Sequence, residues 1–180
     1  TLVRGKHRGE YYLKIIDNGE GIDDFKYVAT HIADSIKAKL KENGAEGIQG
    51  EFGIGLLSFW TVGEELTITS AGSDGKARRM KLVRNNPGYS IQEDNRLFSG
   101  RGTELLIRPI LAGVRQLTGE KIQHYLATEL RERINRRNVQ ITINDKTSRK
   151  ELVVEPHKFA GRLLHNLPRL SSPFGEVYHE

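Results

Sequence analysis

The sequence predicts an α/β domain (α+β) in which short strands form one sheet and amphipathic helices pack against it. Aromatic and β-branched residues fill positions 11–16 and stop at Asp17, where a glycine-rich turn begins; this pattern is typical of a strand entering a turn. Strict alternation over residues 139–143 predicts a second strand. Apolar residues spaced three and four apart between Gly119 and Asn138 predict a helix that buries one face.

The remaining elements follow from local patterns of the same kind. Four strands with a hairpin turn after the first are expected to form a meander, and they occupy residues 66–70, 80–83, 89–91 and 104–107. Residues 152–154 add a strand before Pro156. Asp23 and Asp24 are suited to cap a helix that starts near Phe25, and the continuous apolar run at residues 56–62 predicts a buried helix.

Composition restricts the class of protein. The 180 residues are 37% hydrophobic and 28% charged, and no apolar run approaches the length of a membrane span. The absence of cysteine excludes disulfides, thiolate zinc sites and cysteine nucleophiles, and it favours a cytoplasmic location. The amino terminus lacks the apolar core of a signal peptide. A net charge of +5 favours polyanionic partners such as nucleotides or nucleic acids.

Domain organisation follows from where the patterning stops. Residues 1–155 are expected to form one domain, and residues 156–180, with Pro168, Pro173 and Gly175, a connector toward a further domain. Residues 34–49 lack a hydrophobic stripe and are rich in charge, which predicts a lid or long loop.

The glycine-rich segments fit neither of the two common phosphate-binding loops. Gly50 and Gly55 have P-loop spacing, but Leu56 follows where that loop requires lysine. A dinucleotide fingerprint fails because Ser58 occupies the third glycine position and the preceding segment is polar. Two glycine loops therefore remain that neither motif explains.

Two glycine loops occur in a fixed order, Asp17-x-Gly19-x-Gly21 and Gly50-x-x-Gly53-x-Gly55, and Gly102-Thr103 then leads into a strand. Residues 11–145 in this order resemble the GHKL ATPase superfamily of gyrase, the ninety-kilodalton heat-shock chaperones, histidine kinases and MutL. The segment 48–58 looks most like the chaperone branch, whereas the Asp-Asn-Gly-x-Gly-Ile start at Asp17–Ile22 is shared with MutL and the MORC-type ATPases.

The resemblance implies the Bergerat fold, a two-layer sandwich whose mixed, largely antiparallel sheet is covered by helices on one face. It implies an ATP-binding domain of a chaperone-like or clamp-type ATPase, with ATP and Mg²⁺ as cofactors. The implied nucleotide-binding residues are Asp17, Gly19, Gly21, Ile22, Ser35, Lys37, Gly50, Gly53, Ile54, Gly55, Leu56 and Thr103.

Physical chemistry supports several of these roles. A carboxylate fixed at a strand end, such as Asp17, can accept a hydrogen bond from the exocyclic amine of adenine, and this selects adenine over guanine. Gly19 and Gly21 permit positive φ and leave room for the base. The glycines at 50–55 precede a predicted helix, whose exposed amides form an anion site. Thr103 offers a hydroxyl to the adenine network.

The first motif of the superfamily has no counterpart in this sequence. In the family it lies on a helix before the Asp17 strand and supplies a catalytic glutamate and a magnesium-binding asparagine. No catalytic residue is therefore assigned to this chain, and the magnesium ligand is expected upstream of it. ATP hydrolysis is expected of the intact protein, and this fragment by itself is expected to be inactive and to bind ATP or ADP weakly at best.

Two other functions remain open: a MutL-like or topoisomerase-like ATPase acting on DNA, and a degenerate nucleotide-binding module without turnover. The partners expected besides an adenine nucleotide are a second copy of the intact protein and either a client protein or DNA, with no membrane. The six histidines show no metal-ligand spacing. The arginines at 131, 133, 136 and 137 fit a solvated helix face better than a nucleic-acid site.

Overall fold

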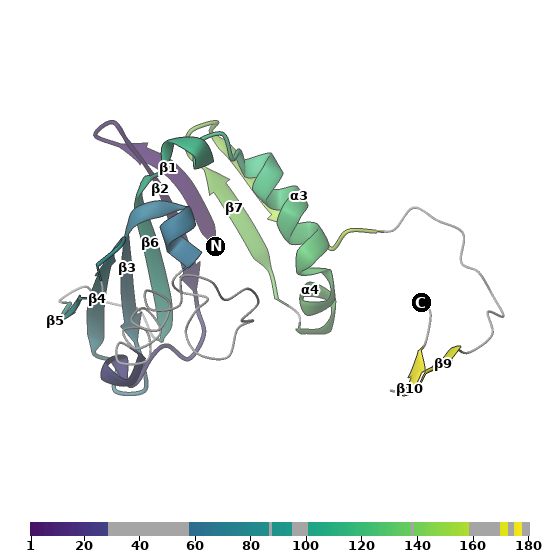
Figure 1. Ribbon diagram of the computed structural model, residues 1–180, viewed down its shortest axis with the longest axis horizontal. Helices are drawn as coiled ribbons and strands as arrows, with labels where there is room; N and C mark the ends of the chain where they lie inside the picture. Colours follow the sequence, from purple (N-terminus) through teal and green to yellow (C-terminus); the bar gives the residue numbers. More distant parts are fainter. Residues whose placement is uncertain are drawn as a thin grey trace.

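One sheet of eight strands organises the protein, in the order β5-β4-β3-β6-β2-β1-β7-β8 (Figure 1). The computed structural model describes residues 1–28, 58–86, 88–94, 101–137, 139–158, 170–172 and 175–177. The strands are β1 Leu2–His7, β2 Glu10–Asp17, β3 Gly63–Ala71, β4 Ala77–Val83, β5 Tyr89–Glu93, β6 Gly102–Ile110, β7 Ile141–Asp145 and β8 Lys150–Val154. Helices are η1 Ser58–Thr61, η2 Ala112–Val114, α3 Gly119–Glu129 and α4 Arg131–Arg137, and residues 25–28 are also helical.

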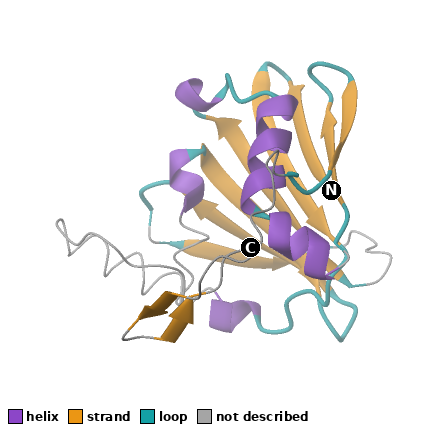
Figure 2. Ribbon diagram, turned by 90° about the vertical axis from the view of Figure 1, so that its right-hand side faces the viewer, coloured by secondary structure: helices purple, strands orange, loops and turns teal. Residues whose placement is uncertain are grey.

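The sheet is mixed but largely antiparallel. β1 runs parallel to β7, with Leu2 opposite Ile143, and every other neighbouring pair in the eight-stranded sheet is antiparallel. Figure 2 shows the helices in front of one face of the sheet. The predicted α+β class and the mixed sheet are confirmed.

Two apolar clusters lie between the sheet and the helices. Alternation along each strand sends every second side chain to the same face, so Leu66 and Ile68 of β3 pack with Phe25 and Phe59. The second cluster joins β1, β7 and β8 to the helix α3 through Leu2, Ile143, Val154 and Ile122. Burying each such side chain contributes about 1.5–3 kcal/mol. Each of the two groups of strands is therefore held by its own helices.

The predicted meander is correct only for β3, β4 and β5. The fourth strand, β6, pairs with β3 and β2 instead of β5. All five residues of β5 are exposed, so β5 is an edge strand that offers little apolar surface to a neighbour. The place beside β3 offers apolar neighbours instead, because there Ile107 of β6 lies between Leu66 of β3 and Leu13 of β2.

The helix predicted between Gly119 and Asn138 is interrupted at Leu130, which separates α3 from α4. The bend allows Ile134 of α4 to pack against the same cluster as Leu126 of α3. Tyr125 belongs to the apolar spacing that predicts this helix, but it does not lie on the buried face, because 63% of it is exposed. Thr118 caps the start of α3 by accepting a hydrogen bond from the Lys121 amide.

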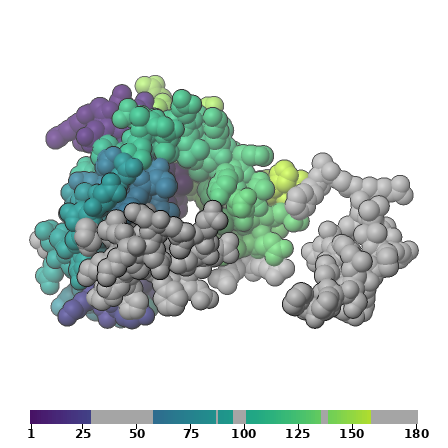
Figure 3. Space-filling view, viewed as in Figure 1, coloured from purple at the N-terminus to yellow at the C-terminus, as the bar shows by residue number. Residues whose placement is uncertain are grey.

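Strand β1 has no counterpart among the sequence predictions. It forms a hairpin with β2 through a two-residue turn at Arg8 and Gly9, both with positive φ, as tight hairpins favour. The tip of this hairpin projects from the molecular surface (Figure 3). The segment predicted as a connector contains a short antiparallel pair, β9 Leu170–Ser172 and β10 Gly175–Val177.

The other predicted strands are confirmed with shifted ends, and β7 begins at Ile141 instead of Val139. Of the apolar run at 56–62, the described part forms the 3-10 helix η1 with Phe59 buried. None of the helices in the described ranges is long and apolar enough to cross a membrane.

Candidate functional site

Three polar side chains form a row across the central strands, at the end of the sheet where β2 stops. Asp17 of β2 lies opposite Thr103 of β6, and Thr103 lies opposite Ser70 of β3. Each of the three lies two residues along its strand from an apolar residue of the helix-covered face: Ile15, Ile68 and Leu105. Because side chains alternate between the two faces of a strand, the three polar residues lie on the helix-covered face too. The strand pairing therefore brings together residues 17, 70 and 103, which are far apart in the sequence.

Asp17 presents a carboxylate that is only partly used by the protein. Its Oδ1 accepts a hydrogen bond of 2.9 Å from the Gly19 amide, which closes a turn at the end of β2. Asp17 is exposed, and its Oδ2 accepts no hydrogen bond from the described residues. An oriented carboxylate with one unoccupied oxygen is a strong acceptor for an N–H group of a ligand.

The glycines of the first loop shape the turn rather than open space for a base. Gly21 has φ +77°, and a Cβ there would collide with the carbonyl oxygen of Ala71. The loop thus packs backbone to backbone on the end of β3, as only glycine allows. Gly19 does not have positive φ, and a Cβ there would lie 3.0 Å from Asp17 Oδ1. The expected positive φ is thus confirmed for Gly21 and wrong for Gly19.

Ser70 fastens the same loop to the sheet. Its hydroxyl accepts a hydrogen bond from the Ile22 amide at 2.9 Å and donates one to the Gly102 carbonyl at 2.8 Å. Its oxygen also lies 3.0 Å from Thr103 Oγ1. Sequence reasoning missed Ser70, although one signal was present: a polar residue at the core-facing position of the β3 pattern that Leu66 and Ile68 begin.

The two aspartates expected to cap the helix at Phe25 have different roles. Asp24 caps it, because its Oδ1 accepts the Tyr27 amide at 2.8 Å. Asp23 instead accepts hydrogen bonds from the amide and hydroxyl of Ser73, at 2.6 and 2.7 Å. The Ser73 amide, followed by its hydroxyl, lowers the pKa of Asp23. This second fastening holds residues 21–24 against the β3–β4 turn.

Apolar surface adjoins the polar row. Ile15 lies two residues before Asp17 on the same face of β2, and 37% of it is exposed. Its neighbour across the strands is Leu105, which packs against the cluster under β3. Exposed apolar surface therefore lies next to hydrogen-bonding groups at this end of the sheet.

Several predicted site residues lie outside the described part of the chain. They are Ser35, Lys37, Gly50, Gly53, Ile54, Gly55 and Leu56, and the predicted lid at 34–49 lies there too. Of the predicted set, the structure brings together Asp17, Gly19, Gly21, Ile22 and Thr103, within one turn and two paired strands.

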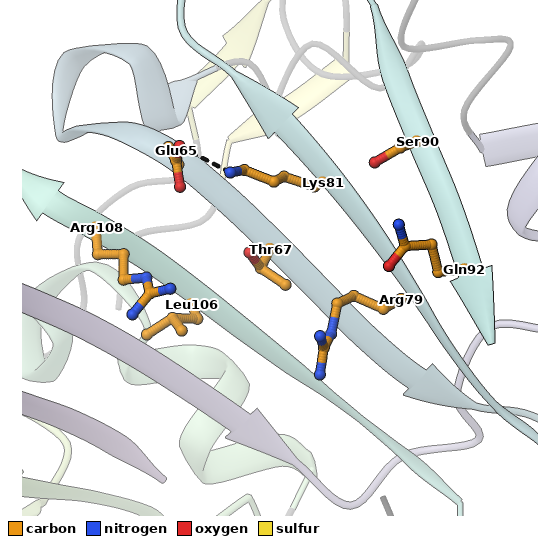
Figure 4. Close-up of a pocket in the computed structure, with 8 residues that line it drawn as sticks. All are labelled: Glu65, Thr67, Arg79, Lys81, Ser90, Gln92, Leu106 and Arg108. Atoms are coloured by element: carbon orange, nitrogen blue, oxygen red, sulfur yellow. Dashed lines mark ion pairs between the residues drawn. The ribbon is translucent and has the colours of Figure 1, made fainter. Parts of the chain in front are cut away.

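A groove of about 460 Å³ lies on the opposite face of the sheet, over β3 to β6 (Figure 4). Its charged groups are largely matched within the protein: Lys81 pairs with Glu65 at 2.8 Å, and Arg79 pairs with Asp94 at 2.7 Å. The groove is therefore a sheet face whose charges are largely paired, and the more exposed of the two pairs, Lys81–Glu65, contributes little energy. It offers a ligand less than the row at Asp17, where one carboxylate oxygen has no hydrogen-bond donor among the described residues.

Among the residues whose placement is described, no three histidine, aspartate or glutamate side chains gather closely enough to hold a metal ion. No protein-family model matches the sequence, and a search of curated proteins finds no match. Within the described residues, the Asp17–Ser70–Thr103 row is the arrangement from which a function can be inferred.

Proposed function

We propose that this chain binds an adenine nucleotide, with the adenine edge against Asp17 and Thr103 and the ring face over Ile15. The observation that carries the proposal is the Oδ2 of Asp17, which accepts no hydrogen bond from the described residues and is held beside Thr103 by strand pairing. An amino group of the base donates to that oxygen, and a hydrogen bond to a charged group contributes about 1.5–3 kcal/mol. The exposed side chain of Ile15 supplies the apolar contact.

The site is preorganised, which lowers the entropic cost of binding. The Gly19 amide fixes the carboxylate of Asp17, and Ser70 fixes the loop and lies against Thr103. The chain therefore does not have to order these groups when the base arrives.

The resemblance of the glycine motifs to the GHKL superfamily extends the proposal to the whole protein. We infer an ATP-driven clamp or chaperone-like ATPase in which this domain binds the nucleotide. The general base and the magnesium ligand belong, in that family, to the motif that this sequence lacks. The proposal for the described residues is accordingly recognition of the base, and no step of hydrolysis is assigned to them.

An NMR titration of the ¹⁵N-labelled chain with ATP tests the proposal. The amides of Gly19, Ile22, Gly102 and Thr103 are expected to shift at millimolar ATP, together with the methyl groups of Ile15. Inorganic triphosphate is the control: it carries the phosphate charge without the base and should leave these signals in place. Shifts confined to the groove at Arg79 and Arg108, or none at all, would contradict the proposal.

A further inference from the structure

The hydroxyl of Ser70 lies at the centre of a hydrogen-bond network that the site needs. Ser70 is 0% exposed, and its oxygen has three partners: the Ile22 amide, the Gly102 carbonyl and the Thr103 hydroxyl. The Ile22 amide can only donate a hydrogen bond, and the Gly102 carbonyl can only accept one. The direction of the third hydrogen bond is therefore the one variable in this network.

Counting protons settles that direction. A serine hydroxyl carries one proton, and the Gly102 carbonyl, which has none to give, takes it. Ser70 then has no proton left for Thr103, so Thr103 must donate its own proton to Ser70. Thr103 consequently keeps only lone pairs for a ligand. An ionised carboxylate also only accepts hydrogen bonds, so Asp17 and Thr103 together present acceptors and no donor.

We propose that Ser70 is the residue that sets base specificity at this site, by holding Thr103 as an acceptor. The inference rests on the proposed nucleotide binding and adds the reason for selectivity. Asp17 and Thr103 are directly opposed on neighbouring strands, a position in which Cβ atoms lie about 4.5–5.5 Å apart. Both can thus reach one exocyclic group, and the two protons of an amino group satisfy both acceptors.

The selected ligands are purines that carry an amino group at this position. Hypoxanthine has a carbonyl oxygen in place of the amine of adenine, and that oxygen would face two acceptors. A site that requires a donor rejects a ligand lacking one, because its polar groups are left unpaired. We expect ITP to bind the chain at least about tenfold more weakly than ATP, by the usual size of a charged hydrogen bond.

Removing the Ser70 hydroxyl should raise the affinity for ITP, whereas damage to the structure would lower the affinity for every nucleotide. In Ser70→Ala, Thr103 loses its acceptor partner, and its proton becomes available to the carbonyl oxygen of ITP. The absolute affinity for ITP should therefore rise, by about threefold or more for one neutral hydrogen bond. A merely loosened site would bind every nucleotide more weakly.

The experiment is an NMR titration of the whole chain with ATP and with ITP, in wild type and Ser70→Ala. Ser70→Ala leaves the Ile22 amide and the Gly102 carbonyl without their partner, so Ser70→Cys serves as a second variant of closer shape if the alanine protein does not fold. The double variant Ser70→Ala/Thr103→Val is the matched control. It removes the released hydroxyl and should abolish the gain in ITP affinity.

Each outcome bears on a separate claim. A rise in ITP affinity that disappears in the double variant supports the role of Ser70. Unchanged or weaker ITP binding in the single variants overturns it and leaves Ser70 as a structural fastener, while ATP binding by wild type still supports the proposed function. Equal binding of ATP and ITP by wild type overturns the acceptor-only site. Absence of binding by either nucleotide refutes the proposed function and this inference with it.

Discussion

Two aspartates end strands in similar turns, yet their carboxylates have opposite surroundings. Asp17 ends β2 and Asp145 ends β7, and each accepts a hydrogen bond from the amide two residues later. Asp145 is 1% exposed and is also bonded to Arg4 and to the amides of Gly119 and Ser148. Asp17 is exposed and has the single partner Gly19 within the described residues.

The difference shows that the same local motif can be enclosed by structural contacts or left accessible to solvent. Arg4 is 8% exposed and donates to both oxygens of Asp145, at 3.0 and 3.2 Å, and to the Arg115 carbonyl. This buried pair ties β1, the end of β7 and the start of α3 together. Asp145 has no capacity left for a ligand, whereas one oxygen of Asp17 accepts no hydrogen bond from the part of the chain that the structure describes.

The largest effect on stability is expected at the buried pair. Asp145→Asn leaves the Arg4 guanidinium buried without a counter-charge, which typically costs about 3–5 kcal/mol. Urea unfolding should show this loss in the free energy of unfolding. Adding Arg4→Met removes the uncompensated charge, so the double variant should recover part of the stability. A double variant no more stable than Asp145→Asn would contradict the role given to the pair.

Acid titration tests the same pair without mutation. Burial raises the pKa of Asp145, but the hydrogen bonds from the Gly119 amide, Arg4 and the Ser148 amide outweigh burial and hold that pKa below its ordinary value. The folded pKa is thus depressed, so the contribution to stability is full above the unfolded value of about 3.9 and is lost as pH falls through the folded value. Wild type should lose more stability below pH 4 than Asp145→Asn does.

A smaller effect is expected where the first loop packs on β3. Gly21→Ala combines positive φ with a collision against the Ala71 carbonyl. Gly75→Ala is a matched control, because Gly75 has φ +67° but open space around it; it should cost only about 1–2 kcal/mol for the left-handed conformation. Thermal unfolding should show a clearly lower Tm for Gly21→Ala. Equal losses in the two variants would mean that the packing of the loop on β3 contributes nothing.

Sequence patterns predicted the structural features near Asp17 that depend on neighbouring residues in the chain. The end of β2, the Asp17 turn and the strand that follows Gly102-Thr103 are predicted from aromatic, β-branched and glycine residues within a few positions. The pair Arg4–Asp145 spans 141 residues, and no pattern of spacing identifies such partners. The placement of β6 beside β3 is equally nonlocal, because it depends on which neighbours can cover Leu105 and Ile107.

Two further features, the strand β1 and the role of Ser70, were not predicted from the sequence. Strand β1 mixes Arg4, Lys6 and His7 with only two aliphatic residues, so periodicity does not reveal it, although the Arg8–Gly9 turn next to β2 is a hairpin signal. Ser70 belongs to no glycine motif. Its role depends on the backbone groups of Ile22 and Gly102, which tertiary structure brings to it.

The central claim is that Asp17 is a ligand-binding carboxylate and Asp145 a structural one, and Asp17→Asn tests it most directly. The Gly19 amide should keep the side-chain oxygen of the substituted amide in place, so an NH₂ group would replace Oδ2 and oppose the amine of adenine. Stability should change by less than about 0.5 kcal/mol, as for an exposed position, while the affinity for ATP measured by NMR titration should fall at least about tenfold. A folded Asp17→Asn protein that binds ATP as tightly as wild type would contradict the account.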